Sequence, residues 1–518
     1  MFPDTGRVST RSTSWLMRHT VTMSQSNDAF SSAPSTPVLP TDASPVRRGL
    51  RVVIIGGGPG GYEAALVAAQ LGAQVQLVEA RGLGGSAVLT DVVPSKTLIA
   101  TAEWLVTTEQ AHSLGITVGQ GEQAVRVNLG TVNARVRALA AEQSHDLTAR
   151  MLHKGIEVVY GRAALGGLDA NGERTIHIPG AAGDREMELK ADVVLLATGA
   201  RPRTLADAAP DGRRILTWTQ LYDLNQAPEH LIVVGSGVTG AEFAGAYLSL
   251  GSRVTLVSSR DRVLPTVDAD AAVLVESAFQ RRGMEVLGGT RAVAARLIDQ
   301  GTDHEGVEVV LSDGRTVRGS HCLMAVGAVP ATAGLGLEEA GVELTESGHV
   351  RVDRVSRTTA YRVYAAGDCT GVLPLASVAA MQGQIAMRHA LGDAVAPLET
   401  ETVAQAVFTL PEIASVGLGQ AQAEAVGLDA VTTTVPLFRN PRAKMQGVTE
   451  GFVKLTSERR SGVVLGGVVV AESASEQIFS ITLAVTQRLS VEQVMNAFSV
   501  YPSVSGTVSE AARQLHVR

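Results

Sequence analysis

Two stretches of the chain carry three glycines at the spacing GxGxxG, which lets a backbone approach a phosphate closely. The first is VVIIGGGPGGYEAALVAAQLGAQVQLVEAR, residues 52–81, and the second is LIVVGSGVTGAEFAGAYLSLGSRVTLVSSR, residues 231–260. They align without a gap, so their glycines correspond in order: Gly56, Gly58 and Gly61 with Gly235, Gly237 and Gly240. Each stretch predicts a buried strand, a glycine turn, an alanine-rich helix and a second strand. This βαβ pattern is typical of a dinucleotide site, where the helix N-terminus faces the pyrophosphate.

The two stretches differ at the residue that would face the ribose of a dinucleotide. The first ends at Glu79, which is at the right distance along the chain to accept from a ribose hydroxyl. The second has Ser258, Ser259 and Arg260 there. Serine and arginine can bind a 2′-phosphate that a carboxylate would repel, so the second site is predicted to accept and to favour NADPH. The alternative is that Ser258 binds the ribose of NADH and Arg260 faces water.

Three further turns follow apolar strands and extend the two predicted sites. Thr198 and Gly199 end the strand of ADVVLLATGARP, and Gly327 ends that of CLMAVGAVPAT. Asp368 follows the strand of VYAAGDCTG and precedes a helical run. Its carboxylate is suited to accept from a polyol or ribityl chain, and the alternative is that it caps the helix.

The composition indicates an α/β protein of about three domains. The chain has 518 residues, 54 of them glycine, with 45% hydrophobic and 18% charged residues. A net charge of −7 argues against nucleic acid as the main partner. Two cysteines are too few for a disulfide framework, and no Cys/His cluster predicts a metal site, so we expect a reducing, cytoplasmic setting. No apolar run reaches the ~18 residues of a membrane span.

The first 48 residues differ from the rest, because they are rich in Ser, Thr and Pro and show no apolar period. We expect a disordered N-terminal extension. The alternative is a transit peptide, since the stretch contains Arg and Ser and is poor in acidic residues.

Taken together, these motifs resemble the pyridine nucleotide-disulfide oxidoreductase family over about residues 50–518. The resemblance implies two Rossmann-like dinucleotide-binding domains, for FAD and for NAD(P)H, and a C-terminal α+β dimerisation domain that makes a homodimer. The expected divisions are an extension at 1–48, a FAD domain in two parts at 49–200 and 328–397, an NAD(P) domain at 201–327, and an interface domain at 398–518.

The resemblance also implies which residues contact the flavin cofactor. They are expected to be Gly56, Gly58, Gly61, Glu79, Arg81, Gly85, Lys96, Ala163, Thr198, Gly199, Asp368 and Ala376. Lys96, in the PSK motif, is expected near flavin N5, where its charge favours the reduced cofactor, and Glu242 is expected to pair with it. The alternative is that Lys96 and Glu242 are ordinary surface charges.

The sulfur chemistry of the family is missing from the sequence. In the frame GGTCxNxGCxPSK, Ala87 and Val92 occupy the two cysteine positions, and neither can form a thiolate or a disulfide. Near the C-terminus, Tyr501 and Gly506 replace the His and Glu of the family's HPTxxE motif. Both thiols and both members of the base pair are absent, so we expect neither dihydrolipoamide nor glutathione reductase activity.

Electrons must then leave the flavin directly for a diffusible acceptor, and planar, electrophilic quinones suit this. The pattern looks most similar to the cysteine-less NAD(P)H:quinone reductases of actinobacterial type within the family. Tyr501 would either hydrogen-bond the quinone across the dimer or only fill the space. The other functions considered are soluble pyridine nucleotide transhydrogenase and a non-catalytic flavoprotein that senses nucleotides or joins a larger complex.

Overall fold

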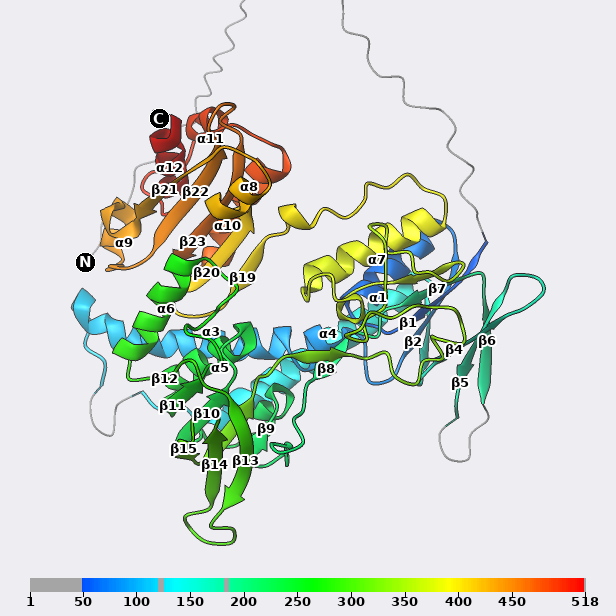
Figure 1. The fold of residues 1–518 in the computed structure, drawn as a ribbon, viewed down its shortest axis with the longest axis horizontal. Coiled ribbons are helices and arrows are strands. Elements are labelled where there is room, and N and C mark those ends of the chain that lie inside the picture. The colour runs from blue at the N-terminus through cyan, green and yellow to red at the C-terminus, as the bar shows by residue number, and fades with distance from the viewer. Residues whose placement is uncertain (1–48, 120–124, 181–185, 517–518) are drawn as a thin grey trace, which may run out of the picture. The chain divides into compact units, whose positions relative to one another are not determined.

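A computed structural model describes residues 49–119, 125–180 and 186–516, and the predicted extension 1–48 lies outside them. The first part of the fold is a five-stranded parallel sheet in the order β18-β7-β1-β2-β3 (Figure 1). Its strands are β1 (Arg51–Ile55), β2 (Gln74–Glu79), β3 (Glu157–Tyr160), β7 (Val193–Leu196) and β18 (Val363–Ala365). Its strands are largely buried runs such as RVVII, as expected where helices cover both faces of a parallel sheet.

Two helices that are far apart in sequence pack closely on this sheet. They are α1 (Pro59–Gln70) and α7 (Ala376–Ala390), which lie side by side in Figure 1. A Cβ atom placed on Gly383 of α7 would lie 2.1 Å from the carbonyl oxygen of Gly60 in α1. The glycine therefore allows the two helices to approach more closely than any side chain would permit.

The second part repeats this design in another five-stranded parallel sheet, ordered β12-β11-β10-β16-β9. Its strands are β9 (Ile215–Leu216), β10 (His230–Val234), β11 (Arg253–Val257), β12 (Glu285–Leu287) and β16 (His321–Met324). Two helices accompany it, α5 (Val238–Ser249) and α6 (Ala269–Arg281). The chain then returns to the first sheet through β18.

The repeat predicted from the two glycine patterns holds at atomic detail. Gly56 and Gly235 have φ angles of +108° and +112°. A Cβ on either would lie 2.2 Å from a carbonyl oxygen, that of Ala197 or of Ala325. In both copies the third glycine, Gly61 or Gly240, would place a Cβ 1.8 Å from the oxygen of the first. Only glycine fits these positions, because a second backbone segment passes too close for any side chain.

Smaller antiparallel sheets accompany the two units. They are β4 (Ala164–Leu168) with β5 (Arg174–Ile178) and β6 (Met187–Ala191), and β13 (Ala292–Ile298) with β14 (Gly306–Leu311) and β15 (Thr316–Gly319). The short strands β8 (Ala200–Pro202) and β17 (Ala328–Pro330) pair with each other, so the chain leaves the first unit and comes back along one antiparallel ladder.

The C-terminal part is an antiparallel five-stranded sheet with helices packed on it, ordered β19-β20-β23-β22-β21. Its strands are β19 (Gln405–Val407), β20 (Glu412–Gly417), β21 (Ala430–Pro436), β22 (Phe452–Glu458) and β23 (Val464–Ala471). Its helices are α8 (Gln420–Ala425), α9 (Pro441–Met445), α10 (Ala474–Thr486), α11 (Val491–Asn496) and α12 (Gly506–His516). The predicted class, two Rossmann-like units and an α+β domain, is confirmed. The numerical domain boundaries stay predictions.

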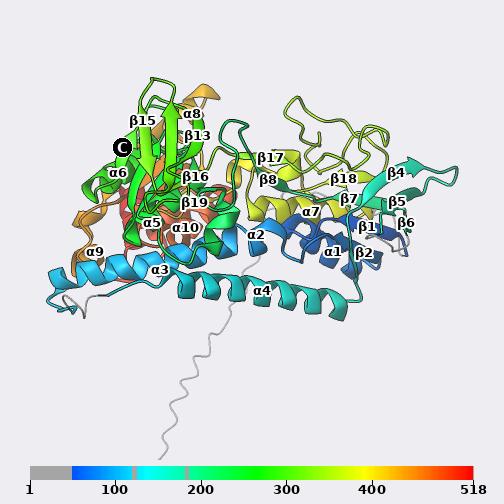
Figure 2. The same cartoon turned by 90° about the horizontal axis from the view of Figure 1, so that it is seen from below.

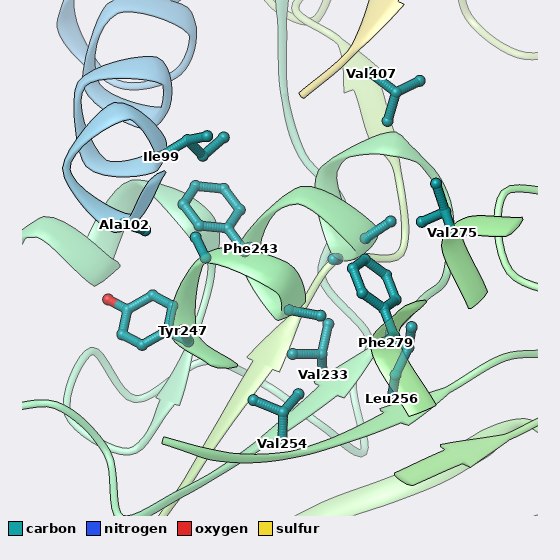
Figure 3. Close-up of a cluster of buried hydrophobic side chains, with 14 of the residues drawn as sticks. Ile99, Ala102, Val233, Phe243, Tyr247, Val254, Leu256, Val275, Phe279 and Val407 are labelled. Carbon is teal, nitrogen blue, oxygen red and sulfur yellow. The ribbon is translucent and has the colours of Figure 1, made fainter. Parts of the chain in front are cut away.

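The PSK motif lies on a helix that links the parts. After the short α2 (Gly85–Leu89), α3 (Val92–Gln110) runs alongside α4 (Leu129–His153) (Figure 2) and also packs on α5. Figure 3 shows Ile99 and Ala102 of α3 in a buried cluster with Phe243 and Tyr247 of α5 and with Val407 of β19. Each large apolar side chain buried there contributes about 1.5–3 kcal/mol, so this cluster fixes α3 against both neighbours.

Three carboxylates meet where α3 approaches the C-terminal part. Glu103 of α3 faces Glu412 of β20 and Glu472, just after β23. Burial, together with these two negative charges, raises the pKa of Glu103 to about 7. Glu412 is held by the Ser475 amide and hydroxyl, each donating to its Oε2 at 3.0 Å.

The substitution Glu103→Gln should therefore stabilise the protein at high pH. The folded chain holds a proton on Glu103 up to about pH 7, whereas the unfolded chain releases it near pH 4.5, the ordinary pKa of a glutamate. The native state consequently loses stability as pH rises through that window. With screening of this half-buried group taken into account, we expect a gain of about 1 kcal/mol at pH 8 and a smaller one at pH 5. Thermal unfolding at both pH values measures this gain. The control is Glu142→Gln, at an exposed position of α4. Equal gains for Glu103→Gln at pH 5 and pH 8 would contradict the explanation.

Candidate functional site

A cavity of about 590 Å³ opens where the strands of the first sheet end. Ten of the twelve residues expected to contact a flavin cofactor line it: Gly56, Gly58, Glu79, Arg81, Gly85, Ala163, Thr198, Gly199, Asp368 and Ala376. Gly61 and Lys96 are not among its lining residues. Gly61 lies beneath the turn, where it allows the backbone crossing described above.

The lining of this cavity fits a dinucleotide cofactor. The glycine turn before α1 brings bare backbone to the helix N-terminus, where N–H groups and the helix dipole favour a pyrophosphate. The hydroxyl of Thr198 is buried and has no hydrogen-bond partner among the described residues. A buried polar atom without a partner is costly, so a ligand group that bonds Thr198 would relieve that cost.

Glu79 is fixed at the end of β2 by the glycine turn itself. It is 8% exposed, and its Oε2 accepts from the Gly57 N–H at 2.7 Å. Its Oε1 accepts from the Arg81 N–H at 2.8 Å. These bonds hold the carboxylate in one orientation at the cavity wall. Its predicted bond to a ribose hydroxyl stays a prediction.

Asp368 lies in the cavity wall and does not cap a helix there. The neighbouring helices η4 (Asp368–Thr370) and α7 have Gly367 and Leu375 at their N-caps, and neither is capped by a side chain. The alternative, that Asp368 caps a helix, is therefore wrong. Burial raises the pKa of Asp368, as expected for a carboxyl that is largely withdrawn from water.

Lys96 and Glu242 form an ion pair between α3 and α5. The Lys96 Nζ lies 2.8 Å from Glu242 Oε2, and the two side chains are 27% and 4% exposed. The other carboxylate oxygen of Glu242 accepts from the Phe408 N–H at 2.9 Å. The Lys96 ammonium also lies 4.8 Å from the centre of the Phe408 ring, within the range of a cation–π contact. The expected pairing is present, and the alternative of two ordinary surface charges is wrong.

At the second fingerprint the three residues expected at the ribose are placed differently. Ser258 is fully buried, and its hydroxyl bonds the Ser236 hydroxyl at 2.7 Å and the Arg260 carbonyl at 2.9 Å. Ser259 and Arg260 are exposed. The buried serine therefore shapes the turn, while the two residues after it reach the surface. Gly327, with φ +94°, lies in the turn between β16 and β17.

The positions without sulfur face the first cavity. Ala87 and Val92 both line it. The two cysteines of the chain lie elsewhere, Cys322 in β16 and Cys369 in η4, and both are free and fully buried. Burial raises their pKa values to about 12 and about 11, so both stay protonated thiols at neutral pH.

Tyr501 does not reach the cavity of its own chain. It is absent from the cavity lining and is 82% exposed, beside Phe498 at 106% and Val500 at 77%. Three large side chains, two of them apolar, are thus presented to solvent just before α12. Whether Tyr501 meets a flavin across a dimer stays a prediction.

One residue of the site was missed by the sequence reasoning. Asp91 lines the cavity between Ala87 and Val92, at a position that is glycine in the family frame. Burial raises its pKa to about 6, with contributions from nearby Glu242 and Asp368 that Lys96 partly offsets. The sequence does contain a signal for it, because an acidic residue stands where the family frame has glycine.

Two family models match the chain. One, described as Pyridine nucleotide-disulphide oxidoreductase, matches residues 50–383, and the other, described as its dimerisation domain, matches residues 403–512. The chain belongs to the pyridine nucleotide-disulfide oxidoreductase family. This confirms the resemblance seen in the sequence. The enzyme is a flavin-dependent oxidoreductase with FAD and NAD(P)H as cofactors, as predicted.

Individual relatives cover almost the whole chain. A protein of Mycobacterium tuberculosis (strain H37Rv) named NAD(P)H dehydrogenase (quinone) is 51% identical over 470 residues, 90% of this chain and 94% of its own. A dihydrolipoyl dehydrogenase of Zymomonas mobilis is 32% identical over 465 residues, 89% and 96% of the two chains. The crystal structure of LpdA from Mycobacterium tuberculosis superposes with a TM-score of 0.84 at 51% identity, covering 90% and 99%.

Two other kinds of site are absent from the described residues. No helix among residues 49–516, outside the two internal gaps, is long and apolar enough to cross a membrane. Within the same ranges, no three His, Cys, Asp or Glu side chains gather in a way that could hold a metal ion.

Removing one partner of the Lys96–Glu242 pair should destabilise the enzyme strongly. Glu242→Ala leaves a partly buried ammonium and the Phe408 N–H without their acceptor, and we expect a loss of about 3 kcal/mol. In the double variant Lys96→Met/Glu242→Ala no charge is left unpaired, so about 1 kcal/mol should return. Denaturant unfolding of Glu242→Ala, Lys96→Met, the double variant and the wild type measures this coupling. Additive losses would show that the two side chains do not interact.

Proposed function

We propose that this enzyme passes electrons from NAD(P)H, by way of bound FAD, directly to a quinone. The proposal rests on the position of sulfur in the structure. Ala87 and Val92 line the cavity, and the two cysteines are buried and do not line it. No thiol of this chain is placed to relay electrons, so the acceptor must come to the cofactor itself. The name of the Mycobacterium tuberculosis relative, NAD(P)H dehydrogenase (quinone), supports the same acceptor class.

The residues of the two glycine turns and of the cavity wall would have different roles in this reaction. When bound, FAD takes two electrons and a proton from NAD(P)H and yields them to an acceptor. The glycine turns at Gly56 and Gly235 would hold the two pyrophosphates. Lys96, kept in place by Glu242, would supply positive charge beside the reduced cofactor. The small apolar side chains of Ala87 and Val92 would leave a dry wall for a planar acceptor.

A homodimer in the cytoplasm completes the proposal. The match to the dimerisation domain supports a dimer, and the exposed Phe498 and Val500 are apolar surface suited to burial against a second subunit. Tyr501, next to them, would then approach the partner's cavity. The two free, buried cysteines fit a reducing compartment.

Acceptor assays on purified enzyme test the proposal. With NADPH or NADH as donor, menadione should be reduced, and lipoamide and oxidised glutathione should not. The reduced enzyme should show no thiolate-to-flavin charge-transfer band, because neither thiol lines the cavity and burial keeps both protonated. Hydride exchange from NADPH to a thio-NAD analogue, without quinone, should be slower than menadione reduction. Measurable lipoamide reduction, or exchange faster than menadione reduction, would contradict the proposed function.

Arg260 should set the preference between the two nucleotides. Arg260→Glu replaces a charge-assisted bond to the 2′-phosphate with repulsion, so kcat/KM for NADPH should fall about 10- to 100-fold while that for NADH changes little. The control is Arg253→Glu, which makes the same change at the amino end of β11, away from the turn. Steady-state kinetics with both donors and menadione measure the ratio. An equal fall for NADH would show that Arg260 does not bind the phosphate.

A further inference from the structure

Asp91 places a carboxyl group in the cavity at the point where the family has glycine. The residue links α2 to α3: its N–H donates to the Ser86 carbonyl at 2.8 Å, and its carbonyl accepts from the Ser95 N–H at 2.7 Å. Its backbone is thereby fixed from both sides. Ala87, Asp91 and Val92 all line the cavity, so the carboxyl accompanies the two positions that lack sulfur.

The ordinary structural role of such an aspartate is not filled. Asp91 is the N-cap residue of α3, where an aspartate normally accepts from the backbone N–H of the first turn. Its side chain makes no capping hydrogen bond. The carboxyl is therefore left free for a group that enters the cavity.

Several charged or titratable groups surround this carboxyl. Lys96 of α3, Glu242 of α5 and Asp368 of η4 act on it electrostatically. Lys96 is already paired with Glu242 at 2.8 Å, so Asp91 is not its ion-pair partner. The other charged residues that line the cavity are Glu79, Arg81, Arg162 and Arg201.

A tyrosine completes these surroundings from the helix η3 (Trp218–Asp223). Burial and the charge of Asp91 raise the pKa of Tyr222 well above its usual value, so it stays protonated at neutral pH. Its buried hydroxyl lies near Ser95 of α3. The pKa of Asp91 itself, about 6, lies close to neutral pH, which is where a general acid works best.

Reduction of a quinone needs such an acid. The balanced reaction is NAD(P)H + H⁺ + quinone → NAD(P)⁺ + hydroquinone. The hydride equivalent from NAD(P)H brings both electrons and one proton, so a second proton must reach the other quinone oxygen. We propose that the Asp91 carboxyl donates this second proton. Its O–H bond breaks as the hydroquinone O–H bond forms, and the carboxylate then takes a proton from solvent. This inference rests on the proposed function.

Reoxidation of the reduced holoenzyme tests the role of Asp91. Enzyme reduced with one equivalent of NADPH is mixed with menadione in a stopped-flow instrument between pH 5 and 9. The wild-type rate should be level below about pH 6 and should fall tenfold per pH unit above it, because the fraction of Asp91 that is protonated falls tenfold per pH unit there. Asp91→Asn should be slower by about 10²-fold at pH 6 and should lose the pH dependence. Asp91→Glu should keep it.

Ferricyanide separates proton donation from a structural effect, because it accepts one electron at a time and no proton. Its rate of reduction should be the same in the wild type, in Asp91→Asn and in Asp303→Asn, a control on an exposed loop. If Asp91→Asn slows ferricyanide as much as menadione, or leaves menadione and its pH profile unchanged, the role of Asp91 is wrong. If menadione does not reoxidise even the wild type, the quinone proposal fails with it.

A readout without turnover examines the carboxyl directly. Infrared difference spectra of the oxidised holoenzyme across the same pH range, wild type minus Asp91→Asn, should contain the band of a protonated carboxylic acid that is half lost near pH 6. Absence of this band from pH 5 upward would mean that Asp91 is already ionised, and the proposal would be overturned.

Discussion

The ion pair of Lys96 and Glu242 joins the three parts of the molecule at one point. Lys96 comes from the first unit, Glu242 from the second, and Phe408, which donates to Glu242, from the start of the C-terminal part. With Glu242 only 4% exposed, the carboxylate depends on these two donors. The apolar cluster around α3 keeps the helix where the lysine reaches its partner. Loss of sulfur from the adjacent positions leaves this arrangement untouched.

The same pair explains why the PSK motif alone is weak evidence of flavin chemistry. Lys96 does not line the cavity, and its removal would leave a buried carboxylate without its cation, so the lysine is required for structure as well. The stronger evidence for the cofactor is the cavity itself, with its glycine turn and the unpartnered Thr198 hydroxyl. Lys96 is therefore required by the fold through its ion pair with Glu242, separately from any role beside the cofactor.

Much of the fold followed from local sequence because local sterics dictate it. Gly56 and Gly235 are required by backbone crossings that no other residue allows, and apolar runs such as RVVII are required by a sheet covered on both faces. The burial of Ser258 was not predictable, because it depends on Ser236 from a different turn. Asp91 was only partly predictable, because the sequence shows an acidic residue at a glycine position of the family frame, whereas the uncapped helix start is seen only in the structure. Tyr501 is exposed on its own chain, so the contacts within one chain do not show what it meets.

The burial of both cysteines affects how the enzyme responds to thiol-reactive reagents. The whole sequence contains two cysteines, and neither has any exposed surface. Enzymes that carry electrons through a dithiol offer a nucleophile to arsenicals, alkylating agents and peroxides, and they are inactivated when it reacts. In this chain such reagents find no thiolate. The proposed direct route from the cofactor to its acceptor would therefore be insensitive to reagents that inactivate a dithiol.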